Sequence, residues 1–195
     1  MDIVVVFDLV GVILNDGEKK YADVLAKRNH LKKEVVYHAM EVNSPAIDTG
    51  KMSLEKFFVS VCRSVGIPYD KRYCNEYPKY FKLNKGILSF IKKLGKRHEI
   101  GLLTNISRDG WNVHNKKYNL AKYFDHVFLS FKLGLAKPDI KIYELLLKKI
   151  KNKHCIFVDD RLKNLVAAHK LGIIPIHYIK FSSMVKNLRK HGVKI

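Results

Sequence analysis

The chain has 195 residues, enough for one substantial domain or for one core with a small insert. Hydrophobic residues make up 47% and charged residues 28% of it, which is typical of a globular protein and excludes a disordered chain. The formal net charge is +19. Lysines are spread along the whole chain, so we favour solvated helix faces over a nucleic-acid partner, although such a charge would also attract polyanions.

Three features predict a cytoplasmic protein without a membrane segment. No apolar run approaches the roughly 20 residues needed to cross a bilayer. The N-terminal segment has neither the basic region nor the cleavage site of a signal peptide. Cys62, Cys74 and Cys155 form no CxxC pair and fit reduced thiols better than a disulfide framework. The oligomeric state cannot be derived from these features.

The first half of the chain changes from a strand pattern to a helical pattern. Ile3–Phe7 is a continuous apolar, β-branched run, typical of a strand buried on both faces. From residue 18 to 81 the apolar residues recur at helical spacing instead. We predict a bundle of three or four helices there, one of them capped by Ser53. Turn-forming residues predict breaks at 43–45, 48–50 and 66–68.

After residue 84 strands and helices alternate. Strands are expected at 100–103, 127–129, 155–158 and 173–176. Helices are expected at 87–94, after Asp139 as a cap through 147, at 162–171, and after Ser182 and Ser183 as caps through 189. This alternation predicts parallel strands with right-handed crossovers, hence a Rossmann-like, three-layer α/β core. We expect residues 1–15 and 84–195 to form this core and residues 16–83 to form a small helical cap domain.

Polar side chains follow several of these strands. Asp8 comes directly after the first strand, Thr104 and Asn105 after the second, and Asp159 and Asp160 after the strand at 155–158. Lys137 precedes the helix that Asp139 caps. Because parallel strands end on one rim of the sheet, we expect these residues to meet in a single crevice.

The residue types in this crevice favour phosphoryl transfer. Three carboxylates repel one another unless a cation neutralises them, and an all-oxygen ligand set suits Mg²⁺. A carboxylate can also attack an electrophile covalently. Lys137 is expected to hold Asp8 ionised and to balance a phosphoryl charge, while Thr104 donates hydrogen bonds to the phosphoryl oxygens. Acyl transfer is less favoured, since no Ser–His pair is placed for it.

Four segments resemble, in order and spacing, the motifs of the haloacid dehalogenase-like superfamily, in the branch with a helical cap after motif one. They are FDLVGVIL at 7–14, LLTN at 102–105, AKP at 136–138 and FVDDRLKN at 157–164. AAHKLG at 167–172 strengthens the match. The resemblance covers the core from residue 1 to about 179, whereas the cap matches only in position and helical character.

The resemblance implies a role for each matching residue. Asp8 would be the nucleophile that forms an aspartyl-phosphate. Thr104 and Asn105 would bind the phosphoryl oxygens together with Lys137, the charge-balancing lysine. The expected substrate is a small anionic phosphorylated compound.

The same resemblance implies a magnesium site. Asp8, Asp159 and Asp160 would hold Mg²⁺, with Asp160 in direct contact and Asp159 binding directly or through water. The backbone carbonyl of Val10 would be a further ligand. Asn164 stands where the family often has an Asp, Glu or Asn that supports the loop.

Val10 is the departure from the family pattern. Related phosphatases usually have an Asp two residues after the nucleophile, which protonates the leaving oxygen and then deprotonates the attacking water. Valine keeps the backbone ligand and removes this proton carrier. We therefore expect metal binding to survive and acid–base catalysis to suffer, although some relatives without this acid are active hydrolases. His30 and His38, in the cap, are candidate replacements.

Three functions follow as hypotheses. The leading one is a Mg²⁺-dependent phosphatase acting on a small organic phosphomonoester. The alternative is a catalytically silent relative that binds a phosphorylated ligand or a polyanion. A haloacid dehalogenase is disfavoured, because relatives with that activity typically carry Ser where this chain has Asp159 and Asp160.

Overall fold

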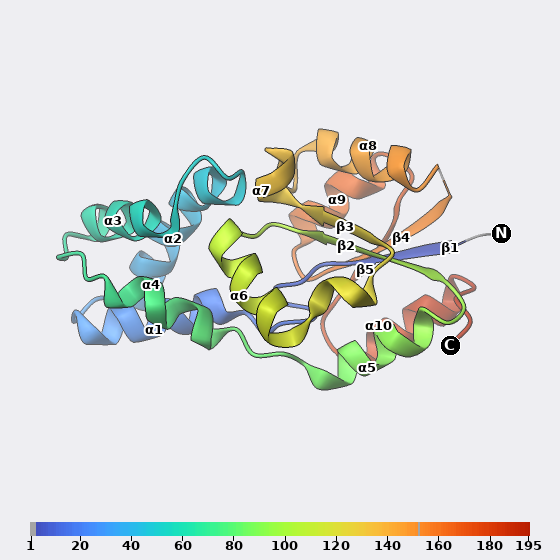
Figure 1. The fold of residues 1–195 in the computed structure, drawn as a ribbon, viewed down its shortest axis with the longest axis horizontal. Coiled ribbons are helices and arrows are strands. Elements are labelled where there is room, and N and C mark those ends of the chain that lie inside the picture. The colour runs from blue at the N-terminus through green and yellow to red at the C-terminus, as the bar shows by residue number, and fades with distance from the viewer. Residues whose placement is uncertain (1–2, 152) are drawn as a thin grey trace.

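A computed structural model describes residues 3–151 and 153–195 of the chain. Its centre is a five-stranded, all-parallel sheet in the order β3-β2-β1-β4-β5 (Figure 1). The strands are β1 (Ile3–Phe7), β2 (Glu99–Thr104), β3 (His126–Leu129), β4 (His154–Asp159) and β5 (Ile174–His177). All five were expected from their short apolar runs, and the observed bounds differ from the expected ones by at most one residue.

Helices cover both faces of the sheet, which confirms the three-layer architecture. One face packs against side chains of α5 (Lys85–Leu94), α6 (Arg108–Tyr118) and α10 (Phe181–Lys190). The other packs against α8 (Ile140–Lys149) and α9 (Leu162–His169). Two shorter helices, η2 (Leu120–Tyr123) and α7 (Ser130–Leu133), flank β3.

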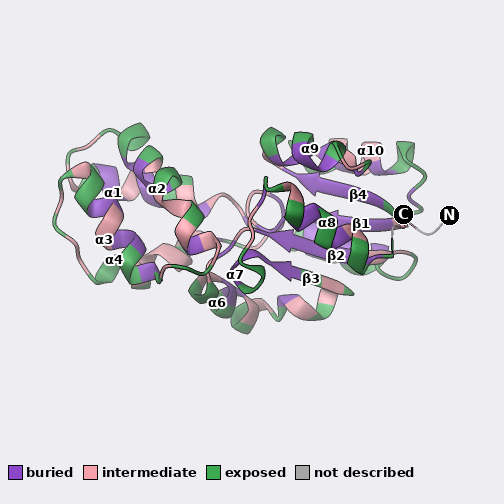
Figure 2. Cartoon of the chain, turned by 90° about the horizontal axis from the view of Figure 1, so that it is seen from above, coloured by how far each residue is buried: buried purple, intermediate pink, exposed green. Residues whose placement is uncertain are grey.

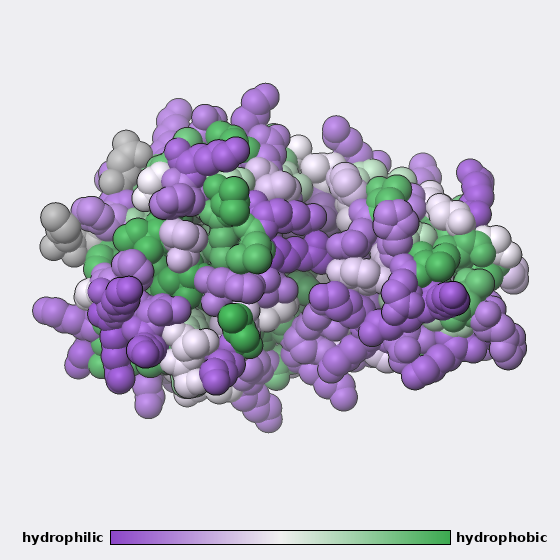
Figure 3. Space-filling view, turned by 180° about the vertical axis from the view of Figure 1, so that it is seen from behind, coloured by the Kyte–Doolittle hydropathy of each residue, from purple (hydrophilic) through white to green (hydrophobic). Residues whose placement is uncertain are grey.

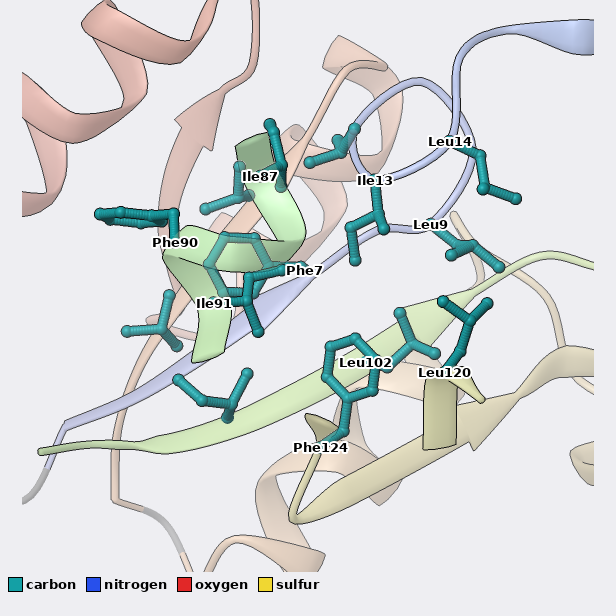
Figure 4. Packing of buried hydrophobic residues seen from close by; sticks show 14 of the residues in the cluster. Phe7, Leu9, Ile13, Leu14, Ile87, Phe90, Ile91, Leu102, Leu120 and Phe124 are labelled. Carbon is teal, nitrogen blue, oxygen red and sulfur yellow. The ribbon is translucent and has the colours of Figure 1, made fainter. Parts of the chain in front are cut away.

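Strand β1 shows how the sequence builds these layers. Successive side chains of a strand point to opposite faces. Val5 and Phe7 enter the cluster beneath α5, whereas Val4 and Val6 enter the cluster beneath α8. All four are fully buried, and the strands are correspondingly purple in Figure 2. Figure 4 shows the first cluster, with side chains of α5 packed over Phe7. A strand buried on both faces explains why this run is continuously apolar.

The residues between β1 and α5 form a separate helical group, as expected. It comprises α1 (Gly17–Arg28), α2 (Lys33–Asp48), α3 (Leu54–Val65), α4 (Arg72–Glu76) and the 3₁₀ helix η1 (Tyr77–Tyr80). These helices have an apolar cluster of their own, whose largest fully buried members include Tyr21, Met40 and Phe58. The group lies beyond one end of the sheet in both Figure 1 and Figure 2.

Two expected helix boundaries were wrong. Helix α2 continues through Pro45 and ends at Asp48, although proline removes one backbone donor. Side chains of this segment instead bond to the helix backbone: Asn43 Nδ2 donates to the Ala39 carbonyl at 2.8 Å and Ser44 Oγ to the Met40 carbonyl at 2.9 Å. The proline also lies in the last turn of the helix, where few further turns depend on the missing bond.

The last helix begins at Phe181, ahead of both expected caps. Ser182 and Ser183 therefore lie inside its first turn and do not cap it. The Phe181 ring packs edge-on against Phe90 of α5, with 5.3 Å between the ring centroids. This tertiary contact outweighs the capping preference of serine. The expected caps Ser53 and Asp139 are confirmed, since each side chain accepts a backbone hydrogen bond.

The chain enters and leaves the helical group through two adjacent segments. Leu14 and Leu83 pair as an isolated antiparallel bridge. Asn15 N donates to the Lys82 carbonyl at 3.0 Å, and Asn84 N donates to the Ile13 carbonyl at 2.9 Å. We call residues 13–15 and 82–84 the connecting ribbon.

Hydrophilic side chains are spread over most of the molecular face in Figure 3, above both the sheet and the helical group. This distribution agrees with the dispersion of lysines along the sequence. Within the described part of the chain, the helices are too short or too polar to cross a membrane.

Candidate active site

The ends of β1 and β4 bring three carboxylates together. Phe7 pairs with Val158 in the sheet, and Asp8 N donates to the Val158 carbonyl at 2.9 Å. One oxygen from each of Asp8, Asp159 and Asp160 lies within 4.8 Å of the other two. The crevice expected from the strand ends is thus present, with Asp8 and Asp159 buried and Asp160 half-buried.

The turn after β1 is shaped to admit Asp160. Gly11 has φ +88°, a backbone conformation that glycine adopts without steric cost. A Cβ atom at this position would lie 2.3 Å from Cγ of Asp160. Only a residue without a side chain lets the motif-one turn approach this carboxylate so closely. Val10, half-buried, lines the same crevice.

Lys137 joins two of the carboxylates. Its Nζ lies 2.9 Å from Asp8 Oδ1 and donates to Asp159 Oδ2 at 2.7 Å, and only 4% of the residue is exposed. Its backbone is fixed by the Asn105 side chain, which accepts from Lys137 N at 2.8 Å and donates to the Lys137 carbonyl at 2.9 Å. Asn105 thereby positions the lysine as well as lining the cavity.

Thr104 lies deeper than expected for a phosphate ligand. Its side chain is fully buried, and its hydroxyl donates to the Asn105 carbonyl at 3.3 Å. The residues that line the cavity after β2 are Asn105, Ile106 and Ser107.

Asp159 and Asp160 have different surroundings. Asp159 accepts from the Arg161 backbone N–H at 2.7 Å and from Asn164 Nδ2, which lies 3.0 Å from both of its oxygens. Asp160 Oδ1 is buried and has no hydrogen-bond partner among the described residues. A buried carboxylate oxygen left without a donor is costly unless a ligand satisfies it.

Charge balance in the cluster favours a cation. Burial, together with Asp159 and Asp160, raises the pKa of Asp8 to about 8, against the lowering effect of Lys137. Burial and Asp159 also raise the pKa of Asp160. Burial tends to raise the pKa of Asp159 too, but Lys137, Arg161 and Asn164 lower it overall.

Lys137 lowers the pKa of Asp8 but does not offset burial and the two neighbouring carboxylates. Three carboxylates beside a single ammonium group leave negative charge uncompensated. The unpartnered oxygen of Asp160 and the hard, all-oxygen donor set fit a divalent cation such as Mg²⁺.

A cavity of about 600 Å³ opens above the cluster, between the sheet and the helical group. Its floor includes Asp8 and Lys137. The helical group contributes an apolar wall, with Ile47, Leu54, Phe57, Tyr77 and Phe81. It also contributes four carboxylates, those of Asp16, Glu18, Glu41 and Asp48. Neither His30 nor His38 is among the lining residues.

Arg161 is a site residue to which the sequence assigned no role. It directly follows Asp160 and reaches across to the helical group. Its guanidinium lies 3.6 Å from Glu18 Oε2 and 3.9 Å from Glu41 Oε1, and it donates to the Tyr37 hydroxyl at 3.4 Å. A basic residue beside the acidic motif was visible in the sequence, but its partners are more than a hundred residues away.

His114 was also not singled out. It lines the cavity from α6, is 3% exposed, and stacks parallel to Tyr118. Burial, and to a lesser extent Lys117, lowers its pKa to about 4, so its imidazole is neutral at physiological pH.

A parallel sheet, a helical insertion after its first strand and a carboxylate–lysine cluster at the strand ends define a Rossmann-like α/β protein with an acidic site beneath the insertion. The family model for haloacid dehalogenase-like hydrolases matches residues 4–172, and the chain belongs to this family.

Known proteins similar to this chain include a phosphatase and a dehalogenase. The sesquiterpene phosphatase astK of Aspergillus oryzae is 26% identical over 153 residues, which cover 73% of this chain and 76% of that protein.

Solved structures share the fold at lower sequence identity. A family enzyme from Bacteroides thetaiotaomicron, in complex with magnesium and inorganic phosphate, aligns with TM-score 0.72 and 18% identity over 92% of this chain and 95% of that one. L-2-haloacid dehalogenase from Xanthobacter autotrophicus, with chloropropionic acid covalently bound, aligns with TM-score 0.68 and 13% identity over 100% of this chain and 85% of that one.

Proposed function

We propose that this protein is a Mg²⁺-dependent phosphatase that hydrolyses a small organic phosphomonoester through an aspartyl-phosphate on Asp8. The observation that carries the proposal is the position of Lys137, which lies between Asp8 and Asp159 at the floor of the cavity, within a cluster of three carboxylates. The similarity to a phosphatase, and to a fold relative that binds magnesium and phosphate, supports this choice.

The proposed metal site uses Asp8, Asp160 and the backbone carbonyl of Val10, with Asp159 binding directly or through water. Asp160 suits direct contact because its Oδ1 has no hydrogen-bond partner among the described residues, whereas both oxygens of Asp159 already accept hydrogen bonds. Asn164 fixes Asp159 in place. When bound, Mg²⁺ would neutralise the carboxylates and polarise the phosphoryl group.

In the proposed reaction, a carboxylate oxygen of Asp8 attacks phosphorus, and the bond from phosphorus to the alcohol oxygen breaks. Lys137 balances the charge on the phosphoryl oxygens, which the low dielectric of a buried site makes effective. Asn105 keeps Lys137 in place and offers a second amide hydrogen to the phosphoryl group. We assign Thr104 a supporting role through its hydrogen bond to the Asn105 carbonyl. Water then releases phosphate from Asp8.

We further propose that residues 16–83 act as a cap domain on a core formed by residues 1–15 and 84–195. The separate apolar cluster of the helical group and the connecting ribbon support these boundaries. The apolar wall of the cavity suits an alcohol with an apolar part, in keeping with a relative that is a sesquiterpene phosphatase.

Phosphate release from p-nitrophenyl phosphate tests the proposal. Wild type should hydrolyse it with Mg²⁺ and lose activity when EDTA removes the metal. Asp8→Asn should be inactive, since an amide oxygen is a poor nucleophile. No turnover by wild type, or undiminished turnover by the variant, would refute the proposal. Chloride release from 2-chloropropionate that persists in EDTA would indicate a dehalogenase instead.

A further inference from the structure

We infer that Asp48, the last residue of α2, is the proton carrier of this active site and replaces the acid that Val10 does not supply. This inference rests on the proposed phosphatase function. It concerns the leaving alcohol oxygen, which needs a proton as its bond to phosphorus breaks, and the attacking water, which must lose one.

The side chain of Val10 has no proton to exchange, so the proton carrier must be another side chain that lines the cavity. Apart from the metal cluster, five carboxylates line the cavity. Asp139 belongs to the core, and Asp16, Glu18, Glu41 and Asp48 belong to the helical group.

Four of the five already have a partner. Asp139 caps α8 by accepting from Lys141 N at 3.0 Å. Asp16 caps α1 by accepting from Lys19 N at 3.1 Å, and it pairs with Lys19 Nζ at 3.0 Å. Glu18 lies 3.6 Å from Arg161. Glu41 lies 3.9 Å from the same guanidinium, with 42% of its side chain exposed. Asp16, Glu18 and Glu41 thus each lie near a cation, although burial raises the pKa of Glu18 to about 7 against the effect of Arg161.

Asp48 differs from them. No hydrogen bond or ion pair joins its side chain to another described residue. Its position also brings no benefit to the helix, because a carboxylate at a helix C-terminus faces the negative end of the helix dipole. Helix stability therefore does not account for an acid at this position.

The end of α2 is anchored above the strand ends. Gly50, two residues after Asp48, lies against the backbone of Phe131 in α7, where an added Cβ would be 2.7 Å from the Phe131 carbonyl oxygen. This contact holds Asp48 at the cavity, close enough for the charge of Lys137 to act on it. Lys137 itself contacts the nucleophile Asp8.

The charged groups that act on Asp48 are Arg161, Lys137 and Lys163, all from the core. In the helical group, burial raises the pKa of Glu18 and of Tyr77, and the charge of Asp48 adds to this effect. Burial raises the pKa of Asp48 to about 6, although the three cations oppose this effect. Near neutral pH both protonation states are accessible, as an acid that later acts as a base requires.

The proposed steps balance. As Asp8 forms its bond to phosphorus, the protonated Asp48 carboxyl gives its proton to the bridging oxygen, and the neutral alcohol leaves. The Asp48 carboxylate then takes a proton from the water that attacks the aspartyl-phosphate. Cleavage of that bond returns phosphate, the Asp8 carboxylate and a protonated Asp48.

The test compares leaving groups in Asp48→Asn. Phenyl phosphate has a poor leaving group that needs the proton, whereas p-nitrophenolate leaves without one. We expect kcat/KM to fall about 10²–10⁴-fold for phenyl phosphate and less than about tenfold for p-nitrophenyl phosphate. We expect the wild-type rate for phenyl phosphate to decrease above about pH 6, where Asp48 loses its proton, and this decrease should be absent in the variant.

Val10→Asp in the Asp48→Asn background is the decisive variant. An acid at the usual position should restore phenyl phosphate hydrolysis at least about tenfold. Asp23→Asn is the matched control, a cap carboxylate outside this cavity that pairs with Lys27 at the surface, and it should behave as wild type. Circular dichroism of each variant checks folding.

Several results would overturn the inference. An equal loss of activity on both substrates would indicate a structural or binding role for Asp48, and no loss would exclude any role. A loss confined to phenyl phosphate in Glu18→Gln, with Asp48→Asn unaffected, would assign the role to Glu18. Wild type that hydrolyses neither ester would refute the proposed function itself, and the inference with it.

Discussion

Replacing Asp8 by Asn should stabilise the metal-free protein, and increasingly so as the pH rises. The folded state raises the pKa of Asp8 from 3.8 to about 8, mainly because the carboxylate is buried. An acid with a raised pKa favours folding at low pH, and this contribution is lost between about pH 4 and pH 8. Asparagine has no such titration, and Lys137 keeps its other partner, Asp159, at 2.7 Å.

The magnitude follows from the two pKa values. A tenfold change in proton affinity corresponds to about 1.4 kcal/mol. The variant should therefore be more stable than wild type by about 2 kcal/mol near pH 5 and by about 5 kcal/mol near pH 8, the latter an upper figure because proteins relax around buried charge. Asp159 and Asp160 titrate in both proteins, so the pH dependence of the difference in unfolding free energy reports the titration of Asp8.

Urea unfolding of both proteins in EDTA, at the two pH values, measures the difference. Added Mg²⁺ should stabilise wild type more than the variant, because the ion binds the folded carboxylates. A difference that is the same at both pH values, or a variant less stable than wild type near pH 8, would refute the view that uncompensated charge dominates this site.

Further substitutions probe the same cluster. Lys137→Met removes the ammonium group that contacts Asp8 and Asp159, so the free energy of unfolding in EDTA, measured by urea, should fall by about 3–5 kcal/mol, and activity should be lost. Gly11→Ala forces a Cβ against Asp160, so Mg²⁺ affinity should fall more than about tenfold by titration calorimetry. Gly66→Ala is its control, because Gly66 also has a positive φ but open space around it, and its Mg²⁺ affinity should be unchanged. Asn164→Ala should weaken Mg²⁺ binding about 10–100-fold with little change in fold, and unchanged binding would contradict its supporting role.

The core of the fold could be predicted because its signals are local. A strand buried on both faces must be apolar throughout, so Ile3–Phe7 and the run ending at Val158 were visible without any tertiary information. One error arose where a tertiary contact outweighs local preference, since packing of Phe181 on Phe90 draws the two serines into the helix. The other is local, because Pro45 lies in the last turn of α2, where Asn43 and Ser44 bond to the helix backbone one turn earlier.

The candidate site also has residues that the sequence predicts and contacts that it does not. Asp8, Lys137, Asp159 and Asp160 follow strands or a fixed turn, and sheet topology alone brings them together. The partners of Arg161 could not be predicted, because they depend on how the helical group is placed over the sheet.

The hydrogen bonds of Asn105 to the backbone of Lys137 could not be predicted from the sequence either. The Asn105 side chain accepts a hydrogen bond from the backbone N–H of Lys137 and donates one to the Lys137 carbonyl. A strand-terminal asparagine gives no sign of which distant peptide group it will bind.

The connecting ribbon has a consequence for how such proteins diversify. Leu14 and Leu83 pair in a backbone bridge although 68 residues lie between them in the sequence. The core therefore presents the same two adjacent chain ends for any segment inserted between them. An insertion whose ends already touch can be lengthened, shortened or exchanged without shifting the register of any strand. The carboxylate–lysine cluster of the core and the helical group above it can therefore change independently, and a single core can acquire new specificities by exchanging one contiguous segment.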